Sequence, residues 1–226
     1  ELNSPIDFYF AHGRSYGLHS TVGCWTYPPI TSCGIWKAIP QDRRDTTFAL
    51  ITDVGNDILY NAQPEEIDRW VREAVLNLSP ICSRIAITEI PLESVIGLGT
   101  VRFTLLRSII FPKCRLNLKK VLDQAALLNE LLKQTAKDSE TLLLRPALDW
   151  YGVDPIHIKS AAKRVAWRNY IGRLVEGNRL HCDSENNEKL RLFLGLRPRS
   201  WRTFGLQRNA QQPDLVLCDG SQLHRY

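Results

Sequence analysis

The sequence predicts an α/β protein with a mostly parallel central sheet that is covered by helices on both faces. Three observations predict this class. Short apolar segments rich in branched and aromatic residues alternate with longer segments of helical periodicity. The apolar segments are nearly continuous, which suits strands buried on both faces, and their alternation with helices is typical of parallel pairing. A chain of 226 residues with 44% hydrophobic residues is also long enough to form such a core.

Four segments are expected to form the strands of this sheet. Each is short and mostly apolar. The expected strands are Ile6–Ala11, Thr47–Thr52, Arg84–Ile90 and Thr141–Arg145.

Three longer segments have the periodicity of helices that cover a sheet. Pro64–Leu78 opens with Pro-Glu-Glu, a typical helix start, and repeats apolar residues every three or four positions. Leu118–Ala136 and Ile158–Val175 repeat the same pattern. A further apolar stretch, Ile96–Phe111, follows the third strand. We expect it to pack into the core as a helix or loop, and the alternative is that it lines an acyl pocket.

A polar stretch at Asn178–Asn187 is expected to be a linker. It divides the chain into a domain at residues 1–177 and a C-terminal extension at residues 178–226. The extension is basic and carries Trp201 and Phe204, but its apolar segment Leu190–Leu196 favours packing on the core or at an interface between copies of the chain. Nucleic-acid binding is the less favoured interpretation.

Composition excludes several classes of partner. The formal net charge of +5 is a mild excess that requires no nucleic acid, and no apolar run reaches the ~18–20 residues of a membrane span. The six cysteines form no CxxC pair and no cluster with histidine, which argues against a structural zinc site. No cofactor is expected. Free thiols are favoured over pairing of Cys24 with Cys33 or of Cys182 with Cys218. Nothing in the composition indicates a cellular location.

The loops that follow the strands are the expected place for chemistry, because ligands of parallel sheets bind at the carboxyl ends of strands. The first strand continues into His12-Gly13-Arg14-Ser15-Tyr16-Gly17, which places a serine hydroxyl between glycines that permit a tight turn. The second strand ends in Thr52-Asp53-Val54-Gly55-Asn56-Asp57, where the carboxamide of Asn56 is able to donate to an oxyanion. Taken alone, each of these segments also fits an ordinary turn.

An acid and an imidazole follow the last predicted strand. Asp154 and His157 lie three residues apart across a proline, so the carboxylate is expected to contact one imidazole nitrogen and leave the other for the serine. Asp154 is also a candidate cap for the helix that follows, and the two roles are compatible.

Taken together, these residues resemble the SGNH or GDSL-type serine hydrolases. The resemblance covers about residues 6–175 and depends on Ser15, Asn56, Asp154 and His157 occurring in that order. It implies a three-layer, flavodoxin-like sandwich and a metal-independent esterase. The implied substrate is a small-molecule ester: an acylated carbohydrate or a lipid.

The resemblance also implies a role for each residue. Ser15 is the implied nucleophile, His157 the general base and then acid, and Asp154 the carboxylate that orients the imidazole. The Ser15 N–H, the Asn56 side chain and one glycine N–H would hold the oxyanion. We favour Gly34 for that glycine, with Gly23 as the alternative.

Two departures from the family pattern keep other functions open. Gly13-Arg14-Ser15 stands where the family has Gly-Asp-Ser, and Val54 stands where it has glycine. A non-catalytic carbohydrate-binding protein on the same scaffold is therefore the second hypothesis. A third hypothesis is an α/β-hydrolase whose nucleophile elbow is the G-x-S-x-G match at residues 13–17.

Two more side chains are candidates for substrate binding. Arg14 would favour an anionic substrate, although a side chain that points into solvent is the simpler expectation. Trp36, together with Trp25 and Tyr27, is able to stack on a sugar ring, and ordinary packing is the alternative.

Overall fold

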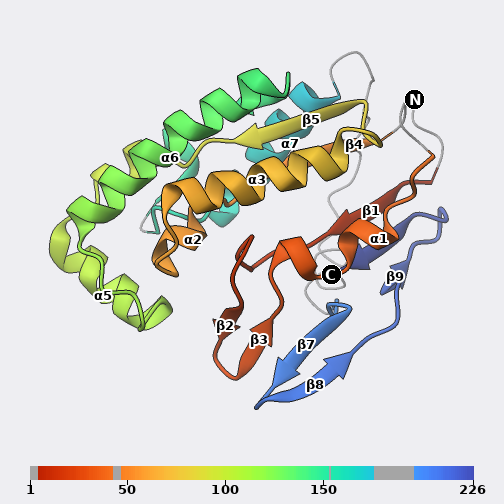
Figure 1. Cartoon of the computed structure of the whole chain (residues 1–226), viewed down its shortest axis with the longest axis horizontal. Helices are drawn as coiled ribbons and strands as arrows, with labels where there is room; N and C mark the ends of the chain where they lie inside the picture. Colours follow the sequence, from red (N-terminus) through yellow and green to blue (C-terminus); the bar gives the residue numbers. More distant parts are fainter. Residues whose placement is uncertain (1–4, 43–46, 153, 176–195) are drawn as a thin grey trace. The chain divides into compact units, whose positions relative to one another are not determined.

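A computed structural model of the chain describes residues 5–42, 47–152, 154–175 and 196–226 (Figure 1). The chain divides into two compact units. The terminal unit consists of Glu1–Pro40 together with Gly177–Tyr226, and the central unit consists of Gln41–Glu176. This division differs from the expected one at residue 177, because the first 40 residues group with the C-terminal segment rather than with the predicted hydrolase core.

The central unit is an α/β structure built on a three-stranded parallel sheet. Its strands are β4 (Phe48–Ile51), β5 (Arg84–Thr88) and β6 (Leu142–Leu144), in the order β4-β5-β6. All three were predicted, and both pairings are parallel as expected. Strand β5 is apolar because it is the central strand of the sheet: Ala86 and Ile87 point to opposite faces, and both are fully buried.

The central unit contains helices that pack on this sheet or on one another. They are α2 (Asn56–Leu59), α3 (Pro64–Leu78), α4 (Leu92–Ile96), α5 (Thr100–Ile110), α6 (Leu118–Asp138) and α7 (Lys163–Leu174), with short 3₁₀ turns at Leu148–Trp150 and Ser160–Ala162. Helices α3 and α6 lie side by side in Figure 1. Helix α7 packs with Ala166, Tyr170 and Leu174 against the face that carries Ala86 and Leu144.

The helix boundaries follow local signals in the sequence. Helix α3 has the predicted bounds, because Pro64 occupies its first turn and Gln63 and Glu66 form a capping box. Helix α6 starts where predicted, since the Asn117 side chain accepts the backbone N–H of Lys120 at 2.9 Å, and it runs two residues further than expected. The stretch predicted as Ile158–Val175 forms the short turn at Ser160–Ala162 and then α7.

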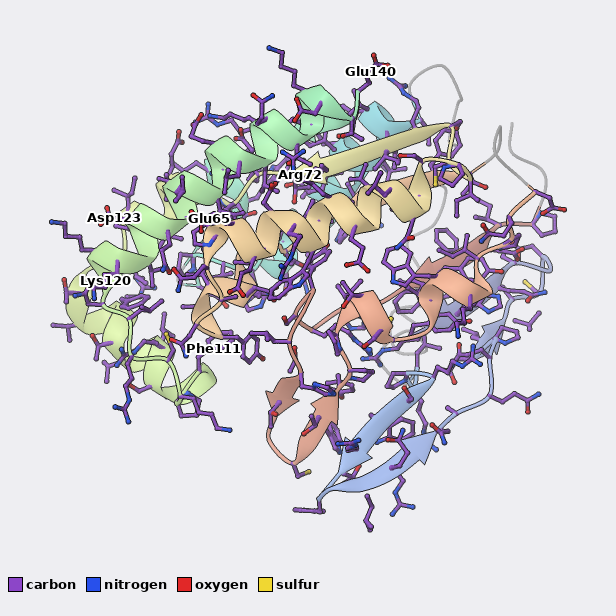
Figure 2. The ribbon with its side chains drawn as sticks, in the orientation of Figure 1. Glu65, Arg72, Phe111, Lys120, Asp123 and Glu140 are labelled. Carbon is purple, nitrogen blue, oxygen red and sulfur yellow. The ribbon has the colours of Figure 1, made fainter. Side chains whose placement is uncertain are left out.

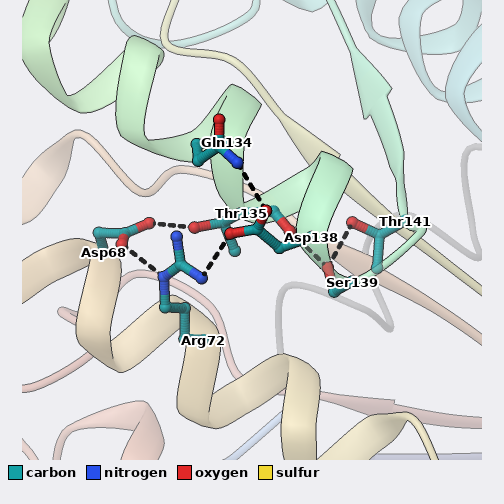
Figure 3. Close-up of polar contacts among 7 residues, drawn as sticks. All are labelled: Asp68, Arg72, Gln134, Thr135, Asp138, Ser139 and Thr141. Atoms are coloured by element: carbon teal, nitrogen blue, oxygen red, sulfur yellow. Dashed lines mark hydrogen bonds and ion pairs between the residues drawn. The ribbon is translucent and has the colours of Figure 1, made fainter.

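A polar network joins α3 to α6 within the packed interface (Figure 3). Asp68, which is 7% exposed, accepts a hydrogen bond from the Thr135 hydroxyl at 2.5 Å and an ion-pair contact from Arg72 at 2.8 Å. Arg72 also reaches Asp138 at 3.2 Å. Figure 2 shows Arg72 on the side of α3 that faces α6, whereas Lys120 and Asp123 lie along the exposed side of α6. The carboxylate of Asp68 is therefore buried with partners on both helices.

The apolar stretch predicted at Ile96–Phe111 forms α5 together with the end of α4. Phe103 is buried as a packed helix requires, but Val101, Leu105 and Ile109 are exposed. The expectation that this stretch packs into the core is therefore met on one side of the helix only. No helix in the described part of the chain is both long and apolar enough to span a membrane.

The terminal unit contains two small sheets. One has the order β1-β10-β9 and consists of Asp7–Phe10, Gln222–Arg225 and Leu215–Val216. The other has the order β2-β3-β7-β8 and consists of Ser20–Val22, Trp25–Tyr27, Ser200–Thr203 and Leu206–Asn209. Between these strands the chain forms a 3₁₀ turn at Ile30–Ser32 and the short helix α1 at Ile35–Ala38.

The first strand is present but was assigned to the wrong sheet. We expected it in the same sheet as β4, β5 and β6, whereas β1 pairs in parallel with β10. Hydrogen bonds at both ends fix this register: the Ile6 N–H donates to the Ser221 hydroxyl at 2.9 Å, and the Tyr226 N–H donates to the Phe10 carbonyl at 2.9 Å. The C-terminal segment is accordingly part of a sheet with β1. The predicted linker and most of the apolar segment Leu190–Leu196 lie outside the described residues.

Candidate active site

Asp154 and His157 are in contact in the loop that follows β6. The Asp154 Oδ1 accepts the backbone N–H groups of Ile156 at 3.0 Å and His157 at 3.2 Å, so the carboxylate closes a tight turn across Pro155. Its Oδ2 lies 2.7 Å from the His157 Nδ1. The same carboxylate therefore shapes the turn and holds the imidazole.

The protonation of this pair follows from its contacts. Partial burial acts to raise the pKa of Asp154, but hydrogen bonds from the Ile156 N–H and from His157 outweigh it, so the pKa lies below its ordinary value. An ionised carboxylate accepts a hydrogen bond from a protonated Nδ1, and in the neutral form of the ring this tautomer has its lone pair on Nε2. The His157 side chain is 61% exposed, so this nitrogen belongs to an accessible ring. The contact with Asp154 favours the tautomer that a general base needs, on a ring that is accessible.

The loop that carries the pair is anchored on two sides. The Ser94 Oγ of α4 lies 2.5 Å from the Pro155 carbonyl and 2.6 Å from the Pro91 carbonyl, so its single hydroxyl proton is shared between them. The Lys159 N–H donates to the Trp150 carbonyl at 2.9 Å. Trp150 is itself buried, with an edge-on contact to Tyr170 at 5.2 Å between ring centroids. The turn is consequently held to the core of the central unit.

Asn56 follows β4 at the same edge of the sheet. The backbone turns through Asp53, whose φ of 57° is in the left-handed region, and Asn56 then begins α2 with its side chain half-buried. Both Asn56 and His157 follow the carboxyl ends of strands of one parallel sheet. The structure thus places these two predicted residues at the edge where parallel sheets bind ligands.

Asp53 was not assigned a role from the sequence, yet it interacts with this region. Neighbouring protein raises the pKa of Asp53 although the residue itself is exposed to solvent, while the Thr52 hydroxyl and a protonated His157 act in the opposite direction. Burial and the negative charge of Asp53 raise the pKa of Tyr151 to about 12, so Tyr151 remains an O–H donor at neutral pH. Asp53, Tyr151 and His157 therefore share one electrostatic environment. The position of Asp53 directly after a buried strand was the available signal.

A cavity of about 390 Å³ is lined in part by Ser94, the residue of α4 that contacts the Pro155 carbonyl. Its wall also includes apolar side chains of α4, and its polar lining includes Glu89 after β5, Arg145 after β6 and Lys133 of α6. The Glu89 side chain is 11% exposed and lies 3.8 Å from Arg145. This volume is within the range of small-molecule sites. Sequence analysis did not identify the cavity, because its lining comes from segments that lie far apart in the chain.

Ser15 belongs to the terminal unit and is fully buried. Its N–H donates to the Ser20 hydroxyl at 2.6 Å, and its Oγ accepts the Leu18 N–H at 2.8 Å. Gly13, with φ of 69°, starts the turn that precedes it. In this state both the hydroxyl and the backbone donor expected at the oxyanion are engaged in local hydrogen bonds.

The other predicted residues of the terminal unit have structural contacts. Gly34 has φ of 90° and precedes α1, and Gly23 has φ of 60° in the turn between β2 and β3. The Trp36 indole N–H donates to the Ile30 carbonyl at 3.0 Å. Arg14 is 3% exposed, so the expectation that it points into solvent was wrong. Its guanidinium lies over the ring of Tyr27, at 5.2 Å from the centroid.

The described cysteines and metal-ligating groups form neither a disulfide nor a metal site. The five cysteines in the described part of the chain, Cys24, Cys33, Cys82, Cys114 and Cys218, are free. Within the same residues no group of three or more His, Cys, Asp or Glu side chains is arranged to hold a metal ion. The chain matches no protein-family model, no curated protein and no solved structure.

Proposed function

We propose that the protein is a serine hydrolase that cleaves a carboxylic ester through an acyl-serine intermediate. The observation that carries the proposal is the contact between an ionised Asp154 and the Nδ1 of an accessible His157, in a loop at the carboxyl edge of a parallel sheet. Asn56 follows another strand at that edge and supports it. The three-layer, flavodoxin-like sandwich is part of the same proposal, and helices packed on the β4-β5-β6 sheet support it.

In this mechanism the Ser15 Oγ attacks the ester carbonyl while the His157 Nε2 takes the hydroxyl proton. Asp154 stabilises the imidazolium that forms. The oxyanion accepts hydrogen bonds from the Asn56 side chain and from backbone N–H groups, for which Gly34 and Ser15 are the candidates. The intermediate collapses, and the alcohol leaves with the proton from His157. Water then repeats the cycle on the acyl group and releases a carboxylic acid.

The proposal requires the hydrogen bonds of Ser15 to be exchanged during the reaction. Its N–H is donated to Ser20 and its Oγ accepts from Leu18. An incoming ester carbonyl would have to replace Ser20 as the acceptor of that N–H. Binding energy from the rest of the substrate would have to offset this exchange.

A fluorophosphonate probe and a short p-nitrophenyl ester test the proposal. The wild-type chain should be labelled at Ser15, and Ser15→Ala should lose labelling and hydrolysis. Asp154→Asn should lower turnover by roughly 10⁴-fold, because the wrong imidazole tautomer then faces the nucleophile. Asp154→Asn also leaves the turn at Ser15 untouched, so its effect does not depend on the folding of Ser15→Ala.

Ser108→Ala is the matched control, since Ser108 is an exposed serine on α5 that donates to the Thr104 carbonyl. It should retain full labelling and turnover. Labelling of Ser15→Ala to the wild-type level, or unchanged turnover in both Ser15→Ala and Asp154→Asn, would reject the proposal.

The second candidate function is carbohydrate binding without turnover. Two observations favour it: Ser15 is fully buried with its hydroxyl engaged, and the cavity beside Ser94 combines apolar walls with the polar groups of Glu89 and Arg145. Sugar hydroxyls both donate and accept, so a carboxylate beside a guanidinium suits them. Saccharide-observed NMR that detects binding, in a chain that no fluorophosphonate labels, would favour this candidate over the hydrolase.

A further inference from the structure

Arg14 is a buried cation with two unused donors. Its Nη1 donates to the Pro28 carbonyl at 3.3 Å, and one face of the guanidinium lies over Tyr27. Its Nε and Nη2 are buried and have no hydrogen-bond partner among the described residues. A guanidinium stays protonated, and leaving its donors unsatisfied in the interior is costly. Buried groups of this kind commonly mark the place of a bound ion or water.

The two unused nitrogens are the pair that recognises oxyanions. Nε and Nη2 lie on the same edge of the guanidinium and donate in parallel to two oxygens of a carboxylate or phosphate. Nη1, which is already bonded to Pro28, belongs to a different edge. The contacts of Arg14 therefore fix the orientation of the side chain and leave its bidentate edge unoccupied by any described residue.

A second arginine lies at the same end of the β1-β10 pair. Arg225 is the register partner of Phe10, and because the strands are parallel, both residues lie at the carboxyl ends of their strands. From Phe10 the chain continues through His12 to Arg14. Arg225 donates through Nη1 to the Leu196 carbonyl, its Nη2 lies 3.5 Å from the His12 Nε2, and its Nε is buried without a partner in the described residues.

The positive charge of this cluster is only partly balanced: the carboxylate of Asp214 acts on Arg225 through space, and no described carboxylate has such an effect on Arg14. Among the described residues, no carboxylate forms an ion pair with Arg14 or Arg225. Burial lowers the pKa of both guanidinium groups, and burial together with the charges of Arg225 and Arg14 lowers the pKa of His12 to about 4. His12 is therefore neutral at pH 7, and the two arginines carry the positive charge.

We propose that Arg14 and Arg225 form a binding site for an oxyanion, with the Nε/Nη2 edge of Arg14 as the bidentate contact and Arg225 as the second cation. The ligand is a phosphate, sulfate or carboxylate, either free or as part of a larger molecule. An anion at this position would satisfy the unused donors and balance the buried charge of Arg14 together with the half-buried charge of Arg225. The site goes beyond the proposed hydrolase, since it needs neither His157 nor turnover.

The test uses the whole chain and inorganic phosphate, with sulfate and acetate as parallel probes and chloride at equal ionic strength as reference. Calorimetric titration should show phosphate binding to the wild type, and the midpoint of thermal unfolding should rise with phosphate concentration. Arg14→Lys keeps the charge but lacks the bidentate edge, so it should weaken binding at least ~10-fold. Arg14→Gln should lose binding.

Arg208→Gln is the matched control, because Arg208 is an exposed arginine on β8. It should bind phosphate like the wild type. Tighter binding of acetate than of phosphate and sulfate would identify a carboxylate ligand, and the reverse order would identify a phosphate or sulfate. Should phosphate raise the unfolding midpoint equally in the wild type and in Arg14→Gln, with no titration heat in either, the anion would act on the solvent alone and the site would be rejected.

The outcome is separable from that of the proposed function. Anion binding that depends on Arg14, in a chain without fluorophosphonate labelling, supports the site and rejects the hydrolase. Labelling of Ser15 in a chain that binds none of the three anions supports the hydrolase and rejects the anion site.

Discussion

The amide of Asn129 holds the segment that follows β5, and its replacement by leucine tests how strongly. Asn129 lies on α6 and is 8% exposed. Its Oδ1 accepts the Ile90 N–H at 2.8 Å, and its Nδ2 donates to the Ile90 carbonyl at 3.1 Å. Asn129→Leu removes both hydrogen bonds and keeps the approximate size of the side chain.

The expected cost differs between the two ends of the amide. The Ile90 N–H loses its acceptor, which costs about 1–3 kcal/mol for a group left unsatisfied. The Ile90 carbonyl still accepts the Leu92 N–H at 2.8 Å, so losing its hydrogen bond from Asn129 costs only about 0.5–1.5 kcal/mol. Burial of the added apolar surface offsets about 1 kcal/mol. We therefore expect the free energy of unfolding of the central unit to fall by about 2 kcal/mol.

Urea unfolding followed by the helical circular dichroism signal measures this change, because the long helices α3, α6 and α7 all belong to the central unit. Gln134→Leu is the matched control on the same helix: Gln134 is exposed, and its amide bonds only the exposed Asp138. It should change stability by less than about 0.5 kcal/mol. An Asn129→Leu chain as stable as the Gln134→Leu chain would show that the amide contributes nothing beyond its volume.

Two further predictions concern carboxylates and their hydrogen-bond partners. Thr135→Val keeps the shape of a side chain that is 1% exposed but removes the hydrogen bond to Asp68. Urea unfolding should therefore show that the free energy of unfolding falls by about 1.5–3 kcal/mol. Thr104→Val, on the exposed side of α5, is the control and should have little effect. The pKa of Asp154 is lowered in the folded chain, so the stability it contributes is complete above the ordinary value of 3.8 and is lost as pH falls through the lower folded value. An NMR titration of the Asp154 carboxyl carbon measures this, and a midpoint at or above 3.8 would contradict the contact with His157.

Much of the central unit was predictable because its signals are local. The bounds of α3 follow from Pro64 and from the capping box of Gln63 and Glu66, all within one turn. Strand β5 is recognisable because burial on both faces leaves little room for polar residues, and β4 and β6 are apolar and partly buried. The contact between Asp154 and His157 was predictable for the same reason, since three residues and a proline determine it.

The terminal unit was not predictable from local signals. Strand β10, at Gln222–Arg225, is half-buried and has no clear alternation, so nothing in its own residues indicates a pairing with β1. The turn between β7 and β8 places Phe204 at φ of 49° and Gly205 at φ of 80°, a backbone that glycine favours and phenylalanine rarely adopts. The burial of Arg14 has the same origin, because its surroundings are assembled by strands from both ends of the chain.

The pairing of β1 with β10 has a consequence for the order of events during synthesis. The Ile6 N–H and the Ser221 hydroxyl that flank this pairing are 215 positions apart, and the whole central unit is encoded between them. A nascent chain on the ribosome is thus able to complete the β4-β5-β6 sheet while the segment with Arg14 and Ser15 still lacks its neighbouring strand. That segment would remain open to chaperones and proteases until translation reaches β10.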